Sequence, residues 1–197
     1  MGHHLMAHHG SFIRAFFRNA GSVGAVAPSS EALAKLMVDW LDWDEINSVV
    51  EFGPGTGVFT EAIEKRAREG TKLIAIERDA ELAEITRNRC PEVTVRKACV
   101  SEAASICEEE GIASADAILC GLPWASFSEE LQNTLLDEMF EILPPGGKFA
   151  TFAYWQGLAL PAGLRFRRVL RQHFSEVEQS PTAWKNLPPA FVYRCVR

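Results

Sequence analysis

The stretch Glu51-Phe52-Gly53-Pro54-Gly55-Thr56-Gly57 decides the fold, because it joins a short apolar strand to the start of a helix. Glycines let the backbone turn sharply here, and they let a ligand approach where any Cβ would block it. The first backbone N–H groups of the helix then face that ligand. The spacing is G-x-G-x-G rather than the G-x-G-x-x-G of a pyrophosphate site, and Glu51 adds a carboxylate directly before the glycines. This pattern predicts a ligand site at Gly53, Gly55 and Gly57 that favours a cation over a phosphate.

Strand-like and helix-like segments alternate around this turn, which predicts a parallel sheet covered by helices on both faces. The predicted strands of this region are residues 47–52, 72–77, 93–98, 115–123 and 148–154. The predicted helices are residues 32–41 after a Ser30 cap, 58–70 closed by Gly70, 80–89, 128–143 and a basic helix over 165–173. Two more strands, 174–180 and 189–196, have no helix between them and therefore predict an antiparallel hairpin at the sheet edge.

Glu77 ends the second predicted strand, directly after the apolar run LIAI. In an α/β sheet ligands bind at the carboxyl ends of the strands, where a carboxylate can accept hydrogen bonds from both hydroxyls of a ribose. Glu77 therefore predicts that the ligand contains a nucleoside, but this feature suits NAD as well as S-adenosyl-L-methionine (SAM). SAM carries an ammonium and a sulfonium and no phosphate, so Glu51 and the glycine spacing favour SAM.

Composition limits the class of protein and its partners. The 197 residues suit one folded domain, and 47% hydrophobic with 23% charged residues is ordinary for a globular protein. A formal net charge of −6 weighs against nucleic acid as the main partner. No uninterrupted apolar stretch is long enough to span a bilayer, and no secretion signal is recognisable, so we expect a cytoplasmic location. The cysteines show no metal-ligand spacing and are expected to be reduced thiols; they are Cys90, Cys99, Cys107, Cys120 and Cys195.

The first thirty residues divide into two segments. Residues 1–10 contain four histidines and are interpreted as a disordered tail. Residues 11–30 are expected to form an amphipathic helix and a lid segment, because phenylalanines and Ile13 share one helical arc opposite Arg14 and Arg18. Such a helix either packs over the cofactor cleft or lies in the interface of an anionic membrane, and the two roles are compatible. Residues 31–197 form the predicted catalytic domain.

The motif E-F-G-P-G-T-G-V-F-T, the strand-end Glu77 and the turn L-P-P-G-G at 143–147 resemble those of class I SAM-dependent methyltransferases. Three further segments resemble bacterial phospholipid N-methyltransferases that act on phosphatidylethanolamine; they are 23–30 (VGAVAPSS), 121–123 (GLP) and 184–194 (WKNLPPAFVYR). The resemblance covers nearly the whole chain from Phe12 onward. It implies a Rossmann-like sheet of seven strands, SAM as cofactor, and a location at the inner face of the membrane.

The resemblance also implies roles for individual residues. Glu51, Gly53, Gly55 and Glu77 correspond to SAM-binding positions, and Gly57 completes the glycine loop. Cys99 occupies the place after the third strand where the family commonly carries an acidic residue near the adenine. Adenine contacts at Cys99 are then expected to come from the backbone alone.

The candidate acceptor site follows the fourth and fifth strands. Gly121 stands where nucleobase amino-methyltransferases carry Asn or Asp, so only backbone carbonyls can accept a hydrogen bond from the substrate amine there. Tyr154 ends the fifth strand, where its hydroxyl can orient the lone pair of the amine. Trp124 offers an aromatic face to a methylated ammonium, and Trp184 is a further candidate; core or rim packing is the competing interpretation for all three aromatic residues.

The hypothesis from sequence is therefore SAM-dependent N-methylation of a membrane lipid amine, most directly phosphatidylethanolamine. The nearest variant is another aminolipid such as ornithine lipid. Three hypotheses of other classes stay open: an rRNA adenine N6-methyltransferase, an NAD-binding oxidoreductase, and a non-catalytic SAM-binding module. No obligate protein partner is evident from the sequence.

Overall fold

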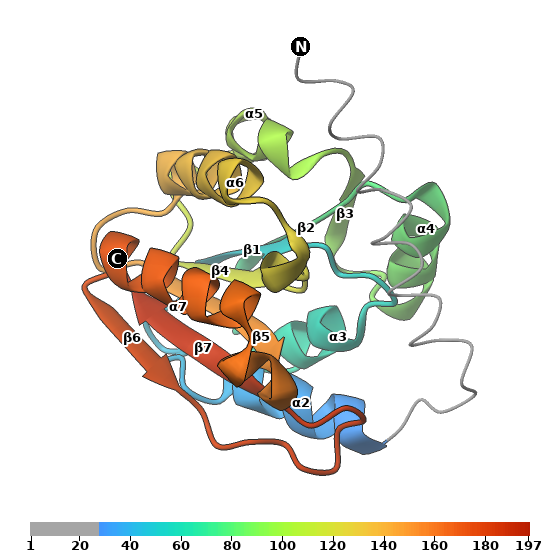
Figure 1. The fold of residues 1–197 in the computed structure, drawn as a ribbon. Helices are drawn as coiled ribbons and strands as arrows, with labels where there is room; N and C mark the ends of the chain where they lie inside the picture. Colours follow the sequence, from blue (N-terminus) through green and yellow to red (C-terminus); the bar gives the residue numbers. More distant parts are fainter. Residues whose placement is uncertain (1–27) are drawn as a thin grey trace.

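A computed structural model describes residues 28–197 (Figure 1). Helices and strands alternate along most of this part of the chain. The helices are α2 (Pro28–Val38), α3 (Val58–Glu64), α4 (Ala80–Arg89), α5 (Ala103–Glu109), α6 (Glu129–Ile142) and α7 (Pro161–His173). The strands are β1 (Ser48–Phe52), β2 (Lys72–Glu77), β3 (Thr94–Lys97), β4 (Ala117–Cys120), β5 (Lys148–Tyr154), β6 (Glu176–Gln179) and β7 (Ala190–Val196). Short 3₁₀ helices follow three of the strands: η1 (Val100–Glu102), η2 (Trp124–Ser126) and η3 (Trp155–Ala159).

The strands of residues 28–197 form one sheet in the order β3-β2-β1-β4-β5-β7-β6. Strands β1 to β5 pair in parallel, whereas β7 pairs antiparallel with both β5 and β6. This arrangement confirms the predicted seven-stranded, mostly parallel sheet and its antiparallel hairpin. The hairpin places β7, not β6, beside β5, so the last strand of the chain enters between two strands made before it.

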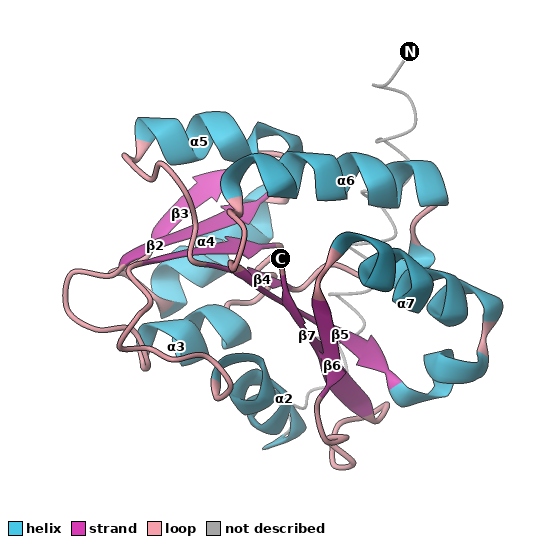
Figure 2. Cartoon of the chain, turned by 90° about the vertical axis from the view of Figure 1, so that its left-hand side faces the viewer, coloured by secondary structure: helices cyan, strands magenta, loops and turns pink. Residues whose placement is uncertain are grey.

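Helices cover both faces of the sheet (Figure 2). Helices α5, α6 and α7 lie on one face, and α2, α3 and α4 lie on the other. The strands alternate their side chains between the two layers. In β1, Val50 and Phe52 belong to the core beneath α5, α6 and α7, whereas Val49 belongs to the core on the α2 side. Glu51 shares the Val49 face of β1, so its carboxylate points toward α3.

Several element boundaries differ from the predictions. Helix α2 begins at Pro28 rather than after Ser30, and proline is well suited to the first turn of a helix. Helix α3 ends at Glu64, where the N–H of Arg66 donates to the carbonyl of Ile63 three residues back, the tighter bond that often closes the last turn of a helix. Gly70, at φ +86°, lies in the turn before β2 and does not close the helix.

Helices α5 and α6 cover the core that contains Val50 and Phe52 of β1. Helix α5 has no counterpart among the predicted elements; the segment 103–109 buries Ala103, Ile106 and Cys107. Helix α6 matches its prediction closely: Ser128 caps it by accepting from the N–H of Leu131, and its buried face runs through Leu135 and Met139.

No helix among residues 28–197 is both long and apolar enough to cross a bilayer.

The strand order reverses between β1 and β4, and parallel α/β sheets bind their ligands at such a switch point. The loop after β1 carries the glycines, and β2 ends at Glu77. Strand β4 runs into Gly121, and β5 ends at Tyr154. These parallel strands therefore bring the predicted cofactor and acceptor residues to the same edge of the sheet.

Candidate functional site

The loop between β1 and α3 requires its glycines. Gly53, Gly55 and Gly57 have φ angles of +66°, +61° and +79°, in a region that side chains disfavour. The N–H of Gly53 donates to the carbonyl oxygen of Ile76 at 3.0 Å, which ties the start of the loop to β2. The loop thus presents backbone rather than side chains at the end of the sheet, as the sequence predicted.

Glu77 is buried and holds the glycine loop directly. Its Oε2 accepts a hydrogen bond from the N–H of Gly55 at 3.1 Å, and its Oε1 accepts one from the N–H of Asp79 at 2.9 Å. Burial raises the pKa of Glu77, and the hydrogen bonds from Asp79 and Gly55 oppose that rise. The backbone N–H of Arg78 is a third donor to this carboxylate. A carboxylate offers about four lone-pair sites, so capacity for a ligand hydroxyl remains. Glu77 can therefore bind a ribose and fix the loop with the same carboxylate.

Glu51 is buried beneath the loop, with 2% of its surface exposed. Its Oε2 accepts a hydrogen bond from the Thr60 hydroxyl of α3 at 2.6 Å. Its Oε1 has no hydrogen-bond partner within the described part of the chain. The pKa of Glu51 is raised to about 8: burial is the largest cause, the nearby Glu77 adds to the rise, and the Thr60 hydrogen bond opposes it. A cation near Glu51 would favour its ionised form and lower this pKa. Thr60 was absent from the sequence prediction, although it stands three residues after Gly57.

Cys99 lies beside this region at the end of β3. The register pairs Lys97 with Glu77, and the N–H of Ala98 donates to the carbonyl of Glu77 at 3.0 Å. Cys99 follows and is half-buried, and its N–H donates to Oε1 of Glu102 at 2.8 Å. A carboxylate is therefore present three residues after Cys99, in a role that the sequence analysis did not assign.

The turn after β4 packs against the glycine loop. The N–H of Gly121 donates to the carbonyl of Phe52 at 2.8 Å, and a Cβ on Gly121 would lie only 2.4 Å from the carbonyl oxygen of Gly53. Likewise, a Cβ on Gly53 would lie 2.6 Å from Cδ2 of Leu122. The close approach of two backbones explains the glycine at position 121, a reason that the sequence did not reveal.

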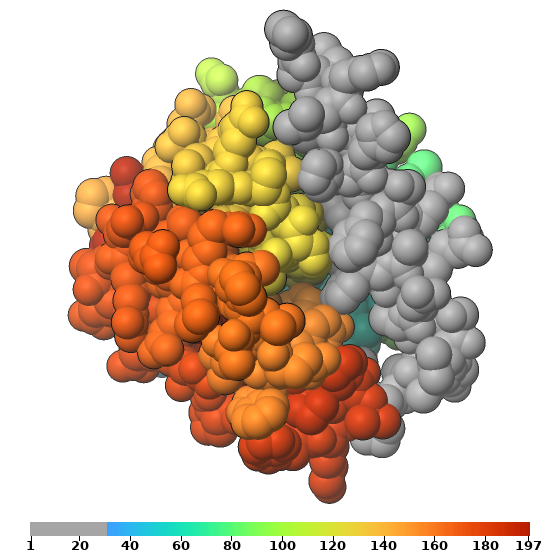
Figure 3. Space-filling model, in the orientation of Figure 1, coloured from blue at the N-terminus to red at the C-terminus, as the bar shows by residue number. Residues whose placement is uncertain are grey.

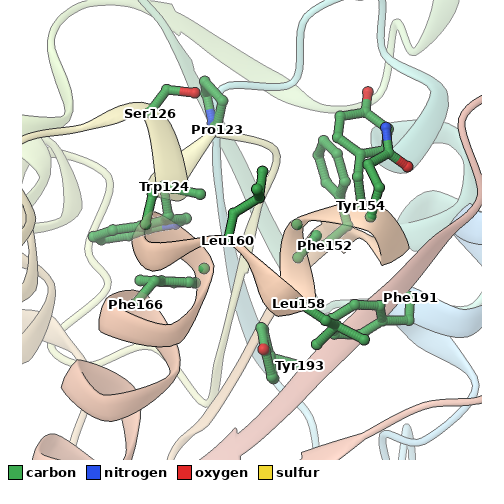
Figure 4. A pocket seen from close by; sticks show the side chains of 16 residues that line it. Pro123, Trp124, Ser126, Phe152, Tyr154, Leu158, Leu160, Phe166, Phe191 and Tyr193 are labelled. Atoms are coloured by element: carbon green, nitrogen blue, oxygen red, sulfur yellow. The ribbon is translucent and has the colours of Figure 1, made fainter.

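A cavity of about 310 Å³ opens beside this turn, between the ends of β4 and β5 and the first turns of α7 (Figure 4). Trp124 and Tyr154 both line it, so the structure brings these two predicted acceptor residues together with Pro123. Its aromatic lining consists of Trp124, Phe152, Tyr154, Phe166, Phe191 and Tyr193. None of the described residues that line the cavity carries a charge.

Trp124 forms part of the cavity wall and is 2% exposed. Its indole stacks on the ring of Phe166 with centroids 5.4 Å apart, and its Nε1–H donates to Sγ of Cys120 at 3.2 Å. The polar edge of the indole is thus used inside the protein. Trp184, in contrast, is 63% exposed and pairs with Trp155 at 5.6 Å, outside the cavity lining.

Tyr154 is half-buried, and burial raises the pKa of its hydroxyl. Phe166, Phe191 and Tyr193 were missed by the sequence prediction because they come from α7 and β7, far from strand ends β4 and β5 along the chain. The predicted tail, residues 1–10, and the predicted amphipathic helix and lid, residues 11–30, lie outside the part whose side chains are described.

The chain matches the family described as "Methyltransferase domain" over residues 49–147. It is 32% identical over 187 residues to an ornithine lipid N-methyltransferase of Singulisphaera acidiphila, a match that covers 93% of each chain. Among solved structures, an O-methyltransferase from Bacillus cereus in complex with SAH superposes with a TM-score of 0.64 at 14% identity, covering 95% of this chain and 91% of that chain.

The O-methyltransferase TomG from Streptomyces achromogenes, in complex with SAM, superposes with a TM-score of 0.62 at 16% identity, covering 87% of this chain and 81% of that one. At such low identities the two superpositions show the fold alone. The family match and the relative of 32% identity show the class of enzyme. The chain therefore belongs to the class I SAM-dependent methyltransferases, with SAM as its cofactor.

Proposed function

We propose that this enzyme transfers the methyl group of SAM to the amine of a membrane aminolipid, with ornithine lipid as the first candidate. The main support for the proposal is the similarity to an ornithine lipid N-methyltransferase, which extends over 93% of both chains. The geometry agrees with a lipid acceptor, because a cavity without charged lining residues adjoins the Gly121–Pro123 turn. Phosphatidylethanolamine is the second candidate, supported by the segments 121–123 and 184–194 that resemble its methyltransferases.

The residues around the glycine loop fit SAM. Glu77 keeps acceptor capacity for a ribose hydroxyl, and the loop offers a cradle that side chains would fill. Glu51 has a buried Oε1 without a partner in the described chain, which suits the cationic amino-acid portion of the cofactor. When bound, SAM supplies a methyl group activated by its sulfonium. Cys99 would contribute to the adenine end from the neighbouring strand.

The acceptor amine must be neutral to react, since its lone pair attacks the methyl carbon. An alkylammonium has an ordinary pKa of about 10.4, and withdrawal from water lowers it. The hydroxyl of Tyr154 stays protonated at neutral pH, because burial raises its pKa above an ordinary value near 10. Its oxygen, with a backbone carbonyl at Gly121, can accept N–H hydrogen bonds from the amine and orient the lone pair. Positioning of this kind requires no covalent assistance from the protein.

A membrane surface is the expected source of the substrate. Large exposed apolar side chains are concentrated around η3, the start of α7 and the segment before β7; they are Trp155, Leu160, Leu164, Trp184 and Leu187. In Figure 3 the orange surface of η3 and α7 meets the red surface of the segment before β7. Helix α7 adds Arg165, Arg167, Arg168 and Arg171, and within residues 31–197 no carboxylate forms an ion pair with them.

Apolar side chains beside unpaired cations suit an anionic leaflet. Residues 11–30 would add a second contact if they form the amphipathic helix that their sequence predicts. We therefore propose a peripheral location at the inner face of the cytoplasmic membrane.

The experiment is a substrate panel with labelled SAM and the full chain. Vesicles of anionic phospholipid would contain ornithine lipid, phosphatidylethanolamine or neither, and structured RNA would form a separate arm. Label in the ornithine lipid fraction supports the proposal. Label in phosphatidylethanolamine alone would reverse the order of the two candidates. Label in RNA, or SAM binding without transfer to any lipid, would reject the proposal.

A further inference from the structure

The cavity beside Tyr154 extends well beyond what the transfer of a methyl group to an amine requires. Its walls combine the ends of β4 and β5 with η3, α7 and β7 (Figure 4). Phe166, Phe191 and Tyr193 are each at most 3% exposed, so they form a closed apolar wall away from the strand ends. At about 310 Å³ the cavity is at the small end of ligand pockets, enough for part of a lipid only.

The chemistry of the lining indicates which part of a lipid the cavity can bind. A charged group withdrawn from water needs a partner, and none of the described lining residues carries a charge. The carboxylate or phosphate of a head group would therefore be destabilised inside the cavity. The aromatic faces do not form an open cage for an ammonium either, because Trp124 stacks on Phe166 and Phe191 packs edge-on against Tyr193 at 4.9 Å. A hydrocarbon segment has no charge to be paired and needs no aromatic cage, so its burial in this cavity is favourable.

The cavity also connects two regions that a lipid must join. Pro123 and Tyr154 line the part of the cavity at the ends of β4 and β5, next to the candidate acceptor site. Leu160 lines it as well and is 55% exposed, and the neighbouring Leu164 is 50% exposed, so its outer side is continuous with the exposed apolar surface. A chain that enters at Leu160 leads toward the place where the amine would react.

We propose that this cavity binds the first segment of one acyl chain of the substrate and thereby positions the attached amine at Tyr154. The inference rests on the proposed function, because it assigns a subsite to the same lipid substrate. It makes the acyl chain a determinant of specificity, so an amine with the same head group and no chain is a poor substrate even when it is fully soluble.

Binding can be measured without turnover by fluorescence quenching. In the full chain carrying Trp155→Phe and Trp184→Phe, the exposed indoles are removed and Trp124 remains in the cavity wall. Trp40 and Trp43 remain too; they pack in the core on the α2 side, and neither lines the cavity. A brominated medium-chain alcohol, used below its micelle concentration, should quench the fraction of the emission that Trp124→Phe removes. Saturable quenching of that fraction is expected, and its absence would overturn the inference.

Turnover supplies the second readout, with a matched pair of variants. Leu160→Glu and Leu187→Glu each replace an exposed leucine by the same charge, but only Leu160 lines the cavity. With dispersed lipid in neutral detergent, Leu160→Glu should raise the KM for the long-chain aminolipid at least about tenfold and leave the Kd for SAM unchanged, whereas Leu187→Glu, on the same exposed surface but outside the cavity, should raise that KM far less. Equal effects of the two variants would overturn the inference.

The two proposals fail differently. Quenching of Trp124 by the brominated chain, with no methyl transfer to any aminolipid, supports the acyl subsite and rejects the proposed substrate. Methyl transfer that is equally efficient with the lipid and with its chain-free head group, without quenching, supports the proposed reaction and rejects the acyl subsite.

Discussion

Glu77 accepts a hydrogen bond from the N–H of Gly55 at 3.1 Å, so the residue expected to bind the ribose also fixes the loop expected to cradle the cofactor. The glycine loop follows β1 and Glu77 ends β2, so a single carboxylate joins the ends of two neighbouring strands. The consequence is that loop order and ribose recognition depend on the same side chain.

Replacement of Glu77 should therefore weaken SAM binding more than the loss of one ligand contact would. For Glu77→Ala we expect the Kd of SAM to rise roughly 10- to 100-fold, which corresponds to one or two charge-assisted hydrogen bonds. Isothermal titration calorimetry measures this. Glu92→Ala, at an exposed position after α4, is the control. A Glu77→Ala variant that binds SAM as tightly as the control would contradict the assignment.

Gly121→Ala tests the contact between the two backbones. The added Cβ would lie 2.4 Å from the carbonyl oxygen of Gly53, so the two loops must separate. We expect a loss of stability of about 1–3 kcal/mol, typical of overpacking, together with weaker SAM binding. Gly157→Ala is the matched control, because a Cβ there meets nothing within 4 Å. Chemical denaturation compares the two, and an equal free energy of unfolding would refute the packing account.

Glu51 should make both stability and SAM affinity depend on pH. Its pKa is raised from 4.5 to about 8, chiefly by burial, so between these values the folded protein holds a proton that the unfolded chain has released. Its contribution to stability is complete below pH 4.5 and is lost as pH rises through 8, with a slope of up to about 1.4 kcal/mol per pH unit.

Glu51→Gln should flatten that slope, which denaturation curves between pH 5 and pH 8 (about the span of the shift) would show. If SAM places its cationic end near Glu51, binding below pH 8 should release a proton in the unmodified chain and none in Glu51→Gln. Calorimetry in buffers of different ionisation enthalpy counts that proton. Identical proton release in both proteins would show that Glu51 does not respond to the cofactor.

Tyr154→Phe separates turnover from cofactor binding. It removes the hydroxyl and keeps the ring in the cavity, so we expect kcat to fall roughly tenfold, equivalent to one hydrogen bond of about 1.4 kcal/mol in the transition state. The Kd for SAM should not change. Steady-state kinetics on the preferred lipid measures both quantities, and an unchanged kcat would remove Tyr154 from the list of positioning residues.

Cys99 should be the cysteine of the described chain that reacts first with thiol reagents. It is half-buried, whereas burial raises the pKa of Cys90 and Cys107 to about 11 and that of Cys120 to about 12. If Cys99 lies beside the adenine, SAM should slow its alkylation. Mass spectrometry of peptides after alkylation, with and without SAM, reads this out. If SAM protects none of the cysteines from alkylation, the adenine does not lie beside Cys99.

The cofactor half of the site could be predicted from sequence because its signals are local. Gly53, Gly55 and Gly57 need positive φ angles, and Glu77 follows an apolar strand directly. The antiparallel ending was also predictable, since 174–180 and 189–196 lack an intervening helix. The end of α3 could not be predicted: the helix stops at Glu64, where the N–H of Arg66 bonds to the carbonyl of Ile63 three residues back, and the apolar pattern of the sequence does not show this change.

The cavity could not be predicted, because it is a product of topology. Strand β7 lies between β5 and β6, and this order brings Phe191 and Tyr193 beside Phe166 of α7. Nothing in the local sequence distinguishes these residues from ordinary core aromatics. The role of Gly121 was hidden for the same reason, since its neighbour Gly53 is distant in the chain.

Mass spectrometry of cellular lipids would show whether the enzyme methylates ornithine lipid. The chain would be expressed in a bacterium that makes ornithine lipid and does not methylate it, with Glu77→Ala expressed in parallel. We expect ornithine lipid that is heavier by one or more methyl groups, located on the head-group amine by fragmentation, in cells with the unmodified enzyme and not in cells with Glu77→Ala. Unmodified ornithine lipid in cells that contain folded, SAM-binding enzyme would contradict the proposed function.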